Sequence, residues 1–130
     1  MSYQYKTQAR KEAFQALFSF YSRGECSLKE LQTIISNKIA CNDMSYKCKQ
    51  MFYNLVYGVY YSYAFINAMT LSIKSSDNIH MPNKIIILLG IYECKGIGTP
   101  VGVVLQEYQE IAEVFASSYA IANLHQILNT

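Results

Sequence analysis

Residues 101–115, VGVVLQEYQEIAEVF, hold the clearest structural pattern in the chain. Apolar side chains such as Val104, Tyr108 and Ile111 recur at steps of three and four residues, which places one apolar stripe along an α-helix. Gln and Glu side chains occupy the opposite face of that helix. Pro100 precedes the stretch and suits the first turn, because proline lacks the amide hydrogen that this turn leaves unbonded. The stretch is therefore predicted to be an amphipathic helix with one buried face.

The same helical spacing recurs along the rest of the chain. Ser27 and Glu30 have the spacing of a capping box, in which each side chain satisfies a free backbone amide at the start of a helix. Pro82 suits another helix start, and the glycines at 96 and 98 favour the end of that helix. Four of the predicted helices cover residues of about 7–22, 45–75, 82–96 and 100–115. Another begins near residue 27, and a last helix is capped by Ser117 or Ser118. No segment alternates with period two, so the chain is predicted to be all-α with about six helices and no sheet.

The third predicted helix is unusual because residues 50–73 carry no charge. Such a length is enough to cross a bilayer, for which about 20 apolar residues suffice. Polar residues interrupt the stretch, and its tyrosines crowd the middle instead of the two ends, where a membrane helix keeps them. We therefore expect no membrane span. Because the helix is apolar on several sides, we expect it to be long and central in the fold.

Composition predicts one folded domain over residues 1–130. Apolar residues make up 52% of the chain and charged residues 15%, which is unlike a disordered protein. The net charge of +2 is unevenly distributed: residues 1–50 hold eight Lys/Arg and four Asp/Glu, whereas residues 101–130 hold no Lys/Arg and three Glu. Positive potential near the amino end favours a polyanionic partner there.

The sequence contains no pattern of catalytic or metal-binding residues. No Cys-x-x-Cys pair occurs among the four cysteines, and neither His80 nor His125 has metal-ligand spacing to another Cys or His. Gly96-x-Gly98 follows a predicted helix and lacks the third glycine of a dinucleotide loop. Residues 1–16 show no apolar export signal, which predicts free thiols in a reducing cytoplasm. We expect neither enzymatic activity nor a cofactor or metal.

The first predicted helix carries the most informative surface. At 100° per residue, Lys11, Gln15 and Phe18 form a narrow strip opposite the apolar face, and Lys6 and Arg10 lie one turn apart beside it. Cations that neutralise phosphates and a ring that stacks on an unpaired base suit single-stranded nucleic acid. The alternative is that Phe18 packs under another part of the chain, since single exposed aromatic residues are common.

Four blocks of sequence, in order, resemble the NusB family of transcription antitermination factors. The first is ARKEAFQALFS at residues 9–19, and the second is FYNLVYGV at 52–59. The third runs from Ile85 to Glu93 and ends in Ile-Tyr-Glu, and the fourth covers residues 100–115. The resemblance touches most of the chain, from about Ala9 to Leu128.

The resemblance implies a fold of two packed three-helix bundles and a non-enzymatic, cytoplasmic role in bacteria. NusB proteins bind the single-stranded boxA element of RNA together with the small-subunit ribosomal protein NusE. In the RNA polymerase antitermination complex they prevent premature termination, notably of ribosomal RNA transcripts. The family's RNA-binding first helix corresponds here to Arg10, to Lys6 and Lys11 as substitutes of the same charge, and to Phe18, where the family usually has Tyr.

The chain also departs from the family pattern, and other functions stay open. Thr7 and Gln8 stand where the family usually has arginines, and residues 116–119 and 123–126 differ from the segment expected before and within the last helix. A divergent member that lost RNA binding would act as a protein-interaction module, through the Tyr-rich third helix or the face of Glu107, Glu110 and Glu113. The remaining alternatives are the RNA-binding domain of an RNA cytosine methyltransferase and a homodimer through exposed tyrosines.

Overall fold

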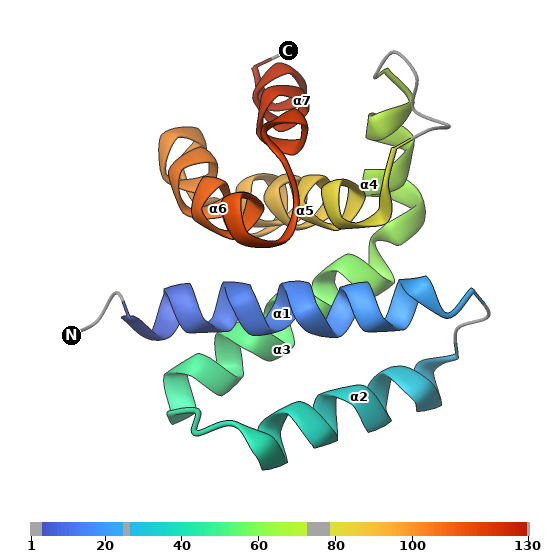
Figure 1. Ribbon diagram of the computed structural model, residues 1–130, viewed down its shortest axis with the longest axis vertical. Coiled ribbons are helices and arrows are strands. Elements are labelled where there is room, and N and C mark those ends of the chain that lie inside the picture. The colour runs from blue at the N-terminus through green and yellow to red at the C-terminus, as the bar shows by residue number, and fades with distance from the viewer. Residues whose placement is uncertain (1–3, 25–26, 73–78, 130) are drawn as a thin grey trace. The chain divides into compact units, whose positions relative to one another are not determined.

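The computed structural model describes residues 4–24, 27–72 and 79–129, and this part of the chain is all-helical (Figure 1). It holds seven α-helices, one short 3₁₀-helix at Thr70–Ser72 and one π-helical turn at Glu93–Ile97. The all-α prediction is confirmed, with seven helices instead of about six. The α-helices are α1 (Gln4–Ser22), α2 (Leu28–Cys41), α3 (Tyr46–Tyr61), α4 (Tyr63–Met69), α5 (Met81–Tyr92), α6 (Val101–Phe115) and α7 (Ser118–Leu128).

The additional helix arises because the predicted helix over 45–75 is interrupted at Ser62. Its backbone angles of φ −97° and ψ 8° leave the helical range, although the Ser62 amide still donates to the Gly58 carbonyl at 3.0 Å. The Ile66 amide likewise donates to the Ser62 carbonyl at 2.9 Å, so hydrogen bonding continues through the break. Neither Pro nor Gly stands at 62, which is why the sequence pattern did not indicate the interruption. The predicted end near residue 75 lies outside the described residues.

The chain divides into two compact units, Met1–Val56 and Tyr57–Thr130, here called the amino-terminal and carboxy-terminal units. In the amino-terminal unit, α1 lies beside α2 (Figure 1). The predicted apolar face of α1 is confirmed, since Ala9, Ala13, Ala16, Leu17 and Phe20 are all fully buried. The predicted cap at the start of α2 is confirmed in its Ser27 half, because the Ser27 hydroxyl accepts a hydrogen bond from the Glu30 amide at 3.2 Å.

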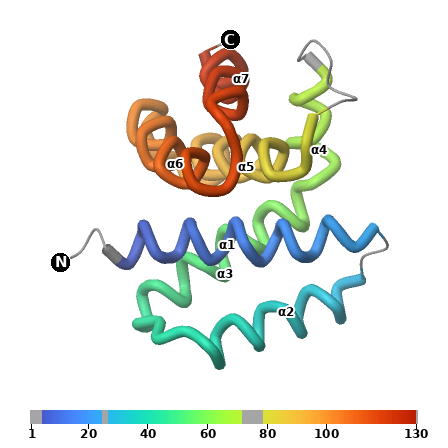
Figure 2. The backbone as a smooth tube through the Cα atoms, viewed as in Figure 1, coloured from blue at the N-terminus to red at the C-terminus, as the bar shows by residue number. Residues whose placement is uncertain are grey.

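The carboxy-terminal unit is built around α5, which packs against α6 and α7 (Figure 2). Every residue from Ile85 to Ile91 is buried, so α5 is covered on all sides. The third predicted helix, expected to be apolar on several sides, is interrupted at Ser62 and buried on one side. On α3 only one side is buried, and Tyr53 and Tyr61 on the other side are exposed, because their hydroxyl groups can remain in water. No helix in the described part combines the length and the apolar character that crossing a membrane requires.

Turns in the carboxy-terminal unit follow the predicted chemistry. Gly98 has φ +94°, a left-handed conformation that glycine adopts without steric cost, and it ends the segment that follows α5. Pro100 is the residue that caps α6. Ser117 caps α7, and its hydroxyl and amide both donate to the Asn83 side-chain oxygen at 3.0 and 3.1 Å. Asn83 thus holds the α6–α7 connection against the start of α5.

Gly90 of α5 lies close to Leu124 of α7, which allows a stability prediction. A Cβ atom at this position would lie 2.3 Å from the Leu124 side chain, which is fully buried and would have to shift. Gly90→Ala is therefore expected to lower the free energy of unfolding by about 1–3 kcal/mol, as overpacking does in other cores. Urea unfolding followed by circular dichroism measures the change.

Gly102→Ala is the matched control, because a Cβ atom at residue 102 meets nothing within 4 Å and the position lies in the first turn of α6. It is expected to be neutral or stabilising by up to about 1 kcal/mol. Equal effects of the two alanines would contradict the close packing of α5 on α7.

Candidate nucleic-acid interface

The exposed face of α1 is a strip of four residues at helical spacing, Thr7, Lys11, Phe18 and Ser22, here called the α1 strip. Residues seven apart return to nearly the same side of a helix, which places Lys11 and Phe18 together. The prediction that these two side chains point outward is confirmed, with Phe18 36% exposed. Lys6 lies one turn away and is half-buried. The strip therefore offers one exposed cation and an aromatic ring to a ligand.

Phe18 is held in position by a second ring. The Phe14 and Phe18 rings are nearly parallel, with an interplanar angle of 2° and centroids 6.1 Å apart. Phe14 is buried, so it anchors the more exposed ring against the helix. A ring fixed in this way loses little conformational freedom when a base stacks on it.

Arg10 does not belong to this exposed face. Its side chain is only 3% exposed, and it takes part in interactions within the folded chain. The prediction that Arg10 lies in a cationic outer surface is therefore wrong. The helical wheel places it 100° from Lys11, and that sector of α1 is covered.

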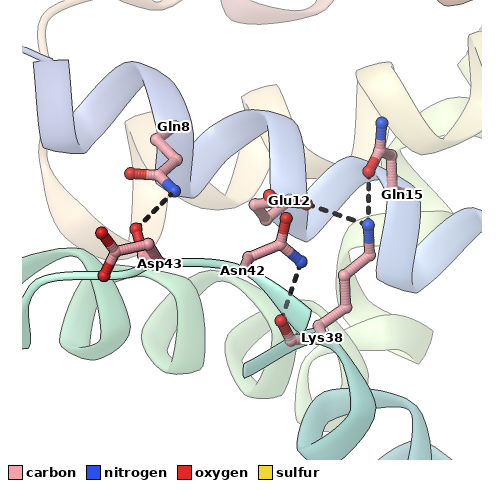
Figure 3. A network of polar contacts seen from close by, with 6 residues as sticks. All are labelled: Gln8, Glu12, Gln15, Lys38, Asn42 and Asp43. Carbon is pink, nitrogen blue, oxygen red and sulfur yellow. Dashed lines mark hydrogen bonds and ion pairs between the residues drawn. The ribbon is translucent and has the colours of Figure 1, made fainter. Parts of the chain in front are cut away.

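Gln15 also differs from the prediction, because the side of α1 that bears it faces α2 (Figure 3). Lys38 of α2 donates from its Nζ to Glu12 Oε1 at 2.9 Å and also to Gln15 Oε1. Gln8 donates to the Asp43 carbonyl at 3.2 Å. These contacts bind one flank of α1 to α2 and to the segment after it, so Gln15 borders the α1 strip without being fully exposed.

Lys47 is a cation near α1 that sequence reasoning missed. Its Nζ lies 6.0 Å from the centre of the Tyr5 ring at the start of α1, within the range of a cation–π contact. Lys47 belongs to α3 and is exposed. No sequence pattern links residues 5 and 47, because only the fold brings them together.

The two units carry opposite net charges. The amino-terminal unit has eight Lys/Arg and four Asp/Glu, whereas the carboxy-terminal unit has three Lys/Arg and five Asp/Glu. A polyanion is therefore attracted to the amino-terminal unit, which bears the α1 strip.

No metal centre is formed by the described residues, among which no group of three His, Cys, Asp or Glu side chains is close enough to hold an ion. The described cysteines, Cys41, Cys48 and Cys94, are free thiols. Burial, and to a smaller extent the nearby Glu12 carboxylate, raise the pKa of the Cys48 thiol, so Cys48 stays protonated and unreactive at neutral pH.

Glu93 is fully buried and accepts a hydrogen bond from the Tyr108 hydroxyl at 2.9 Å, an arrangement that holds α6 to the segment after α5.

Comparison with known proteins agrees with this all-helical fold. A model of the NusB family, a family of non-enzymatic RNA-binding antitermination factors, matches residues 7–123. No curated protein and no solved structure gives a significant match. Because the family match covers most of its length, the chain belongs to the NusB family, and this membership indicates a role related to transcription antitermination.

Proposed function

We propose that this chain is a non-enzymatic, cytoplasmic transcription antitermination factor that binds boxA-like single-stranded RNA together with the ribosomal protein NusE. In this role it joins the RNA polymerase antitermination complex and prevents premature termination, notably of ribosomal RNA transcripts, with residues 1–130 acting as one RNA-binding domain. The observation that carries the proposal is the exposed pair of Lys11 and Phe18 on α1, within a basic unit of a NusB-family chain.

In the proposed mechanism, Lys6 and Lys11 neutralise phosphates while the Phe18 ring stacks on one unpaired base. Arg10 is not a proposed RNA contact, because it is buried. Two neutralised phosphates correspond to a salt slope of only about −1.4, and one stacked base adds about 1–3 kcal/mol. Such a small footprint gives modest affinity, so tight binding requires the added surface of the ribosomal partner. RNA affinity measured with and without NusE tests this requirement, and equal affinities would contradict it.

Substitutions in the α1 strip test the RNA contact directly. Phe18→Ala is expected to weaken binding of a boxA-like single strand by about tenfold or more, because a stacked base is lost. Lys11→Glu is expected to weaken it and to make the salt slope shallower by about 0.7, because one phosphate contact disappears. Fluorescence anisotropy at several salt concentrations measures both changes. Phe18→Tyr keeps a ring and is expected to bind like the unmodified chain.

Two variants in the carboxy-terminal unit serve as matched controls. Lys95→Glu makes the same charge change at an exposed position, and Tyr61→Ala removes an aromatic ring that is 69% exposed. Both are expected to bind RNA normally. If the controls weaken binding as much as the α1 variants do, the RNA contact does not lie on the α1 strip.

A second candidate function is that of a protein-interaction module without RNA binding. The observation that favours it is a groove of about 530 Å³ between α6 and α7, with Leu105, Ala112 and Ile121 among its apolar lining residues and Glu113 at its edge. Exposed Glu110 adds further negative charge on α6. Under this alternative, the unmodified chain binds no single-stranded RNA, and the α1 variants capture protein partners normally.

A further inference from the structure

A second concave site lies in the amino-terminal unit, between α1 and α2, and the family comparison does not describe it. It has a volume of about 290 Å³ and is here called the α1–α2 pocket. This size is near the lower end of the range for small-ligand pockets, about 300–1,000 Å³, and suits a single nucleotide. Its polar lining residues are Gln15, Ser19, Arg23, Asn37, Lys38 and Asn42.

The contacts of Lys38 determine which polar groups of the pocket remain available to a ligand. Lys38 binds the Gln15 side-chain oxygen, so the Gln15 amide nitrogen points away from it as a donor (Figure 3). Asn42 donates from its side-chain nitrogen to the Lys38 carbonyl at 2.8 Å, which leaves its side-chain oxygen as an acceptor. The positive charge of Lys38 is balanced by Glu12 at 2.9 Å. One network thus fixes the side chains of Gln15 and Asn42, which keep a donor and an acceptor that Lys38 does not use.

The other lining residues supply the remaining chemistry of a nucleotide site. Arg23 is exposed and offers a guanidinium, which binds phosphate oxygens in a bidentate geometry. Ile34 and Cys41 form an apolar wall against which the face of a base can pack. Asn37 is exposed and adds an amide that can donate or accept. In such a site, the amide side chains form hydrogen bonds with base edges, and the Arg23 guanidinium positions the phosphate backbone of the RNA.

The pocket adjoins the α1 strip. Gln15 lies four residues after Lys11 and three before Phe18, and residues at these spacings are neighbours on a helix surface, about 5–6 Å apart at Cβ. When one base of a single-stranded RNA stacks on Phe18, the next part of the strand therefore lies beside the pocket. This continuity favours a nucleotide of the same RNA over a free anion as the occupant.

We propose that the α1–α2 pocket binds one nucleotide of the single-stranded RNA, adjacent to the base stacked on Phe18, with Arg23 on its phosphate and the amides of Gln15, Asn37 and Asn42 at its base edge. The inference rests on the proposed RNA-binding function and deepens it. It adds a sequence-reading element to a surface that otherwise offers only charge and stacking.

The exposed thiol of Cys41 in the pocket allows a direct footprint. Alkylation by N-ethylmaleimide is followed by mass spectrometry of peptides, with and without a boxA-like single strand. At an RNA concentration of about ten times the Kd, alkylation of Cys41 is expected to slow by about tenfold, because protection follows the fraction of free protein. Cys94, half-buried in the carboxy-terminal unit, is the internal control and should react at an unchanged rate. An unchanged rate at Cys41 would overturn the proposal.

Variants of the two exposed lining residues provide an energetic test. Arg23→Ala and Asn37→Ala are each expected to weaken RNA binding by about tenfold, because each removes hydrogen bonds to the nucleotide. Lys29→Ala, at an exposed position of α2 outside the pocket, is the charge-matched control and should leave the affinity close to its original value. Retained affinity in both pocket variants would overturn the proposal.

The outcomes separate this inference from the proposed function. If the unmodified chain binds no single-stranded RNA, both proposals fail. If it binds, and Phe18→Ala weakens binding while Arg23→Ala and Asn37→Ala do not and Cys41 is unprotected, only the pocket proposal fails.

Discussion

Replacing Arg10 by Glu is expected to lower the free energy of unfolding by about 3–5 kcal/mol, because a carboxylate of the opposite charge is forced into a buried position that holds a guanidinium. Arg10 is 3% exposed and engaged within the fold, so the substitution places a carboxylate where a guanidinium was held. A small domain has only about 5–15 kcal/mol of stability in total, so much of the variant population is expected to be unfolded at moderate urea concentration. Urea unfolding followed by circular dichroism measures the shift of the midpoint.

The adjacent substitution Lys11→Glu is the control for Arg10→Glu. It makes the same charge change one residue later, at an exposed position, and is expected to change stability by no more than about 0.5 kcal/mol. The pair therefore separates fold from function on one helix: Lys11→Glu weakens RNA binding in a folded protein, whereas Arg10→Glu loses binding through loss of the fold. Equal stabilities of the two variants would show that Arg10 is not held in the core.

The misplacement of Arg10 shows what helical periodicity can and cannot predict. Periodicity gives the angle of each residue around its own helix, and the buried face from Ala9 to Phe20 follows from it correctly. It does not say how wide a sector the rest of the chain covers. On α1 that sector also includes Arg10, Glu12 and Phe14, all of them buried. Helical periodicity alone therefore places Arg10, a charged residue beside an apolar stripe, in solvent, whereas the structure buries it.

Local chemistry was predicted more fully than packing. The Ser27 cap of α2 and the left-handed Gly98 depend on a few neighbouring residues, and both are confirmed. The outward position of Lys11 and Phe18 also follows from spacing within one helix. By contrast, the contact of Lys47 with Tyr5 and the α1–α2 pocket join residues far apart in the sequence, and no local pattern encodes them.

Replacing Lys38 by Met is expected to lower the free energy of unfolding by about 3 kcal/mol. Its Nζ lies 2.9 Å from Glu12 Oε1, and the Glu12 side chain is 8% exposed, so the substitution leaves a desolvated carboxylate without its cation. The Lys38 side chain is 23% exposed, which places the cost at the low end of the range for buried pairs. Lys29→Met on the exposed side of α2 is the control and should change stability by less than about 0.5 kcal/mol. Urea unfolding measures both.

A second substitution shows whether the carboxylate is the source of that cost. Combining Lys38→Met with Glu12→Met removes both charges, and replacing a buried pair by apolar residues is often close to neutral, so most of the stability should return. If the double variant stays as unstable as Lys38→Met alone, the loss comes from packing and not from the unpaired charge. When stability does return, Gln15 lies in a folded protein without its lysine partner. Any loss of RNA affinity then reflects the removal of Lys38 and of its contact with Gln15 from the pocket, so one variant tests both the internal network and the pocket that depends on it.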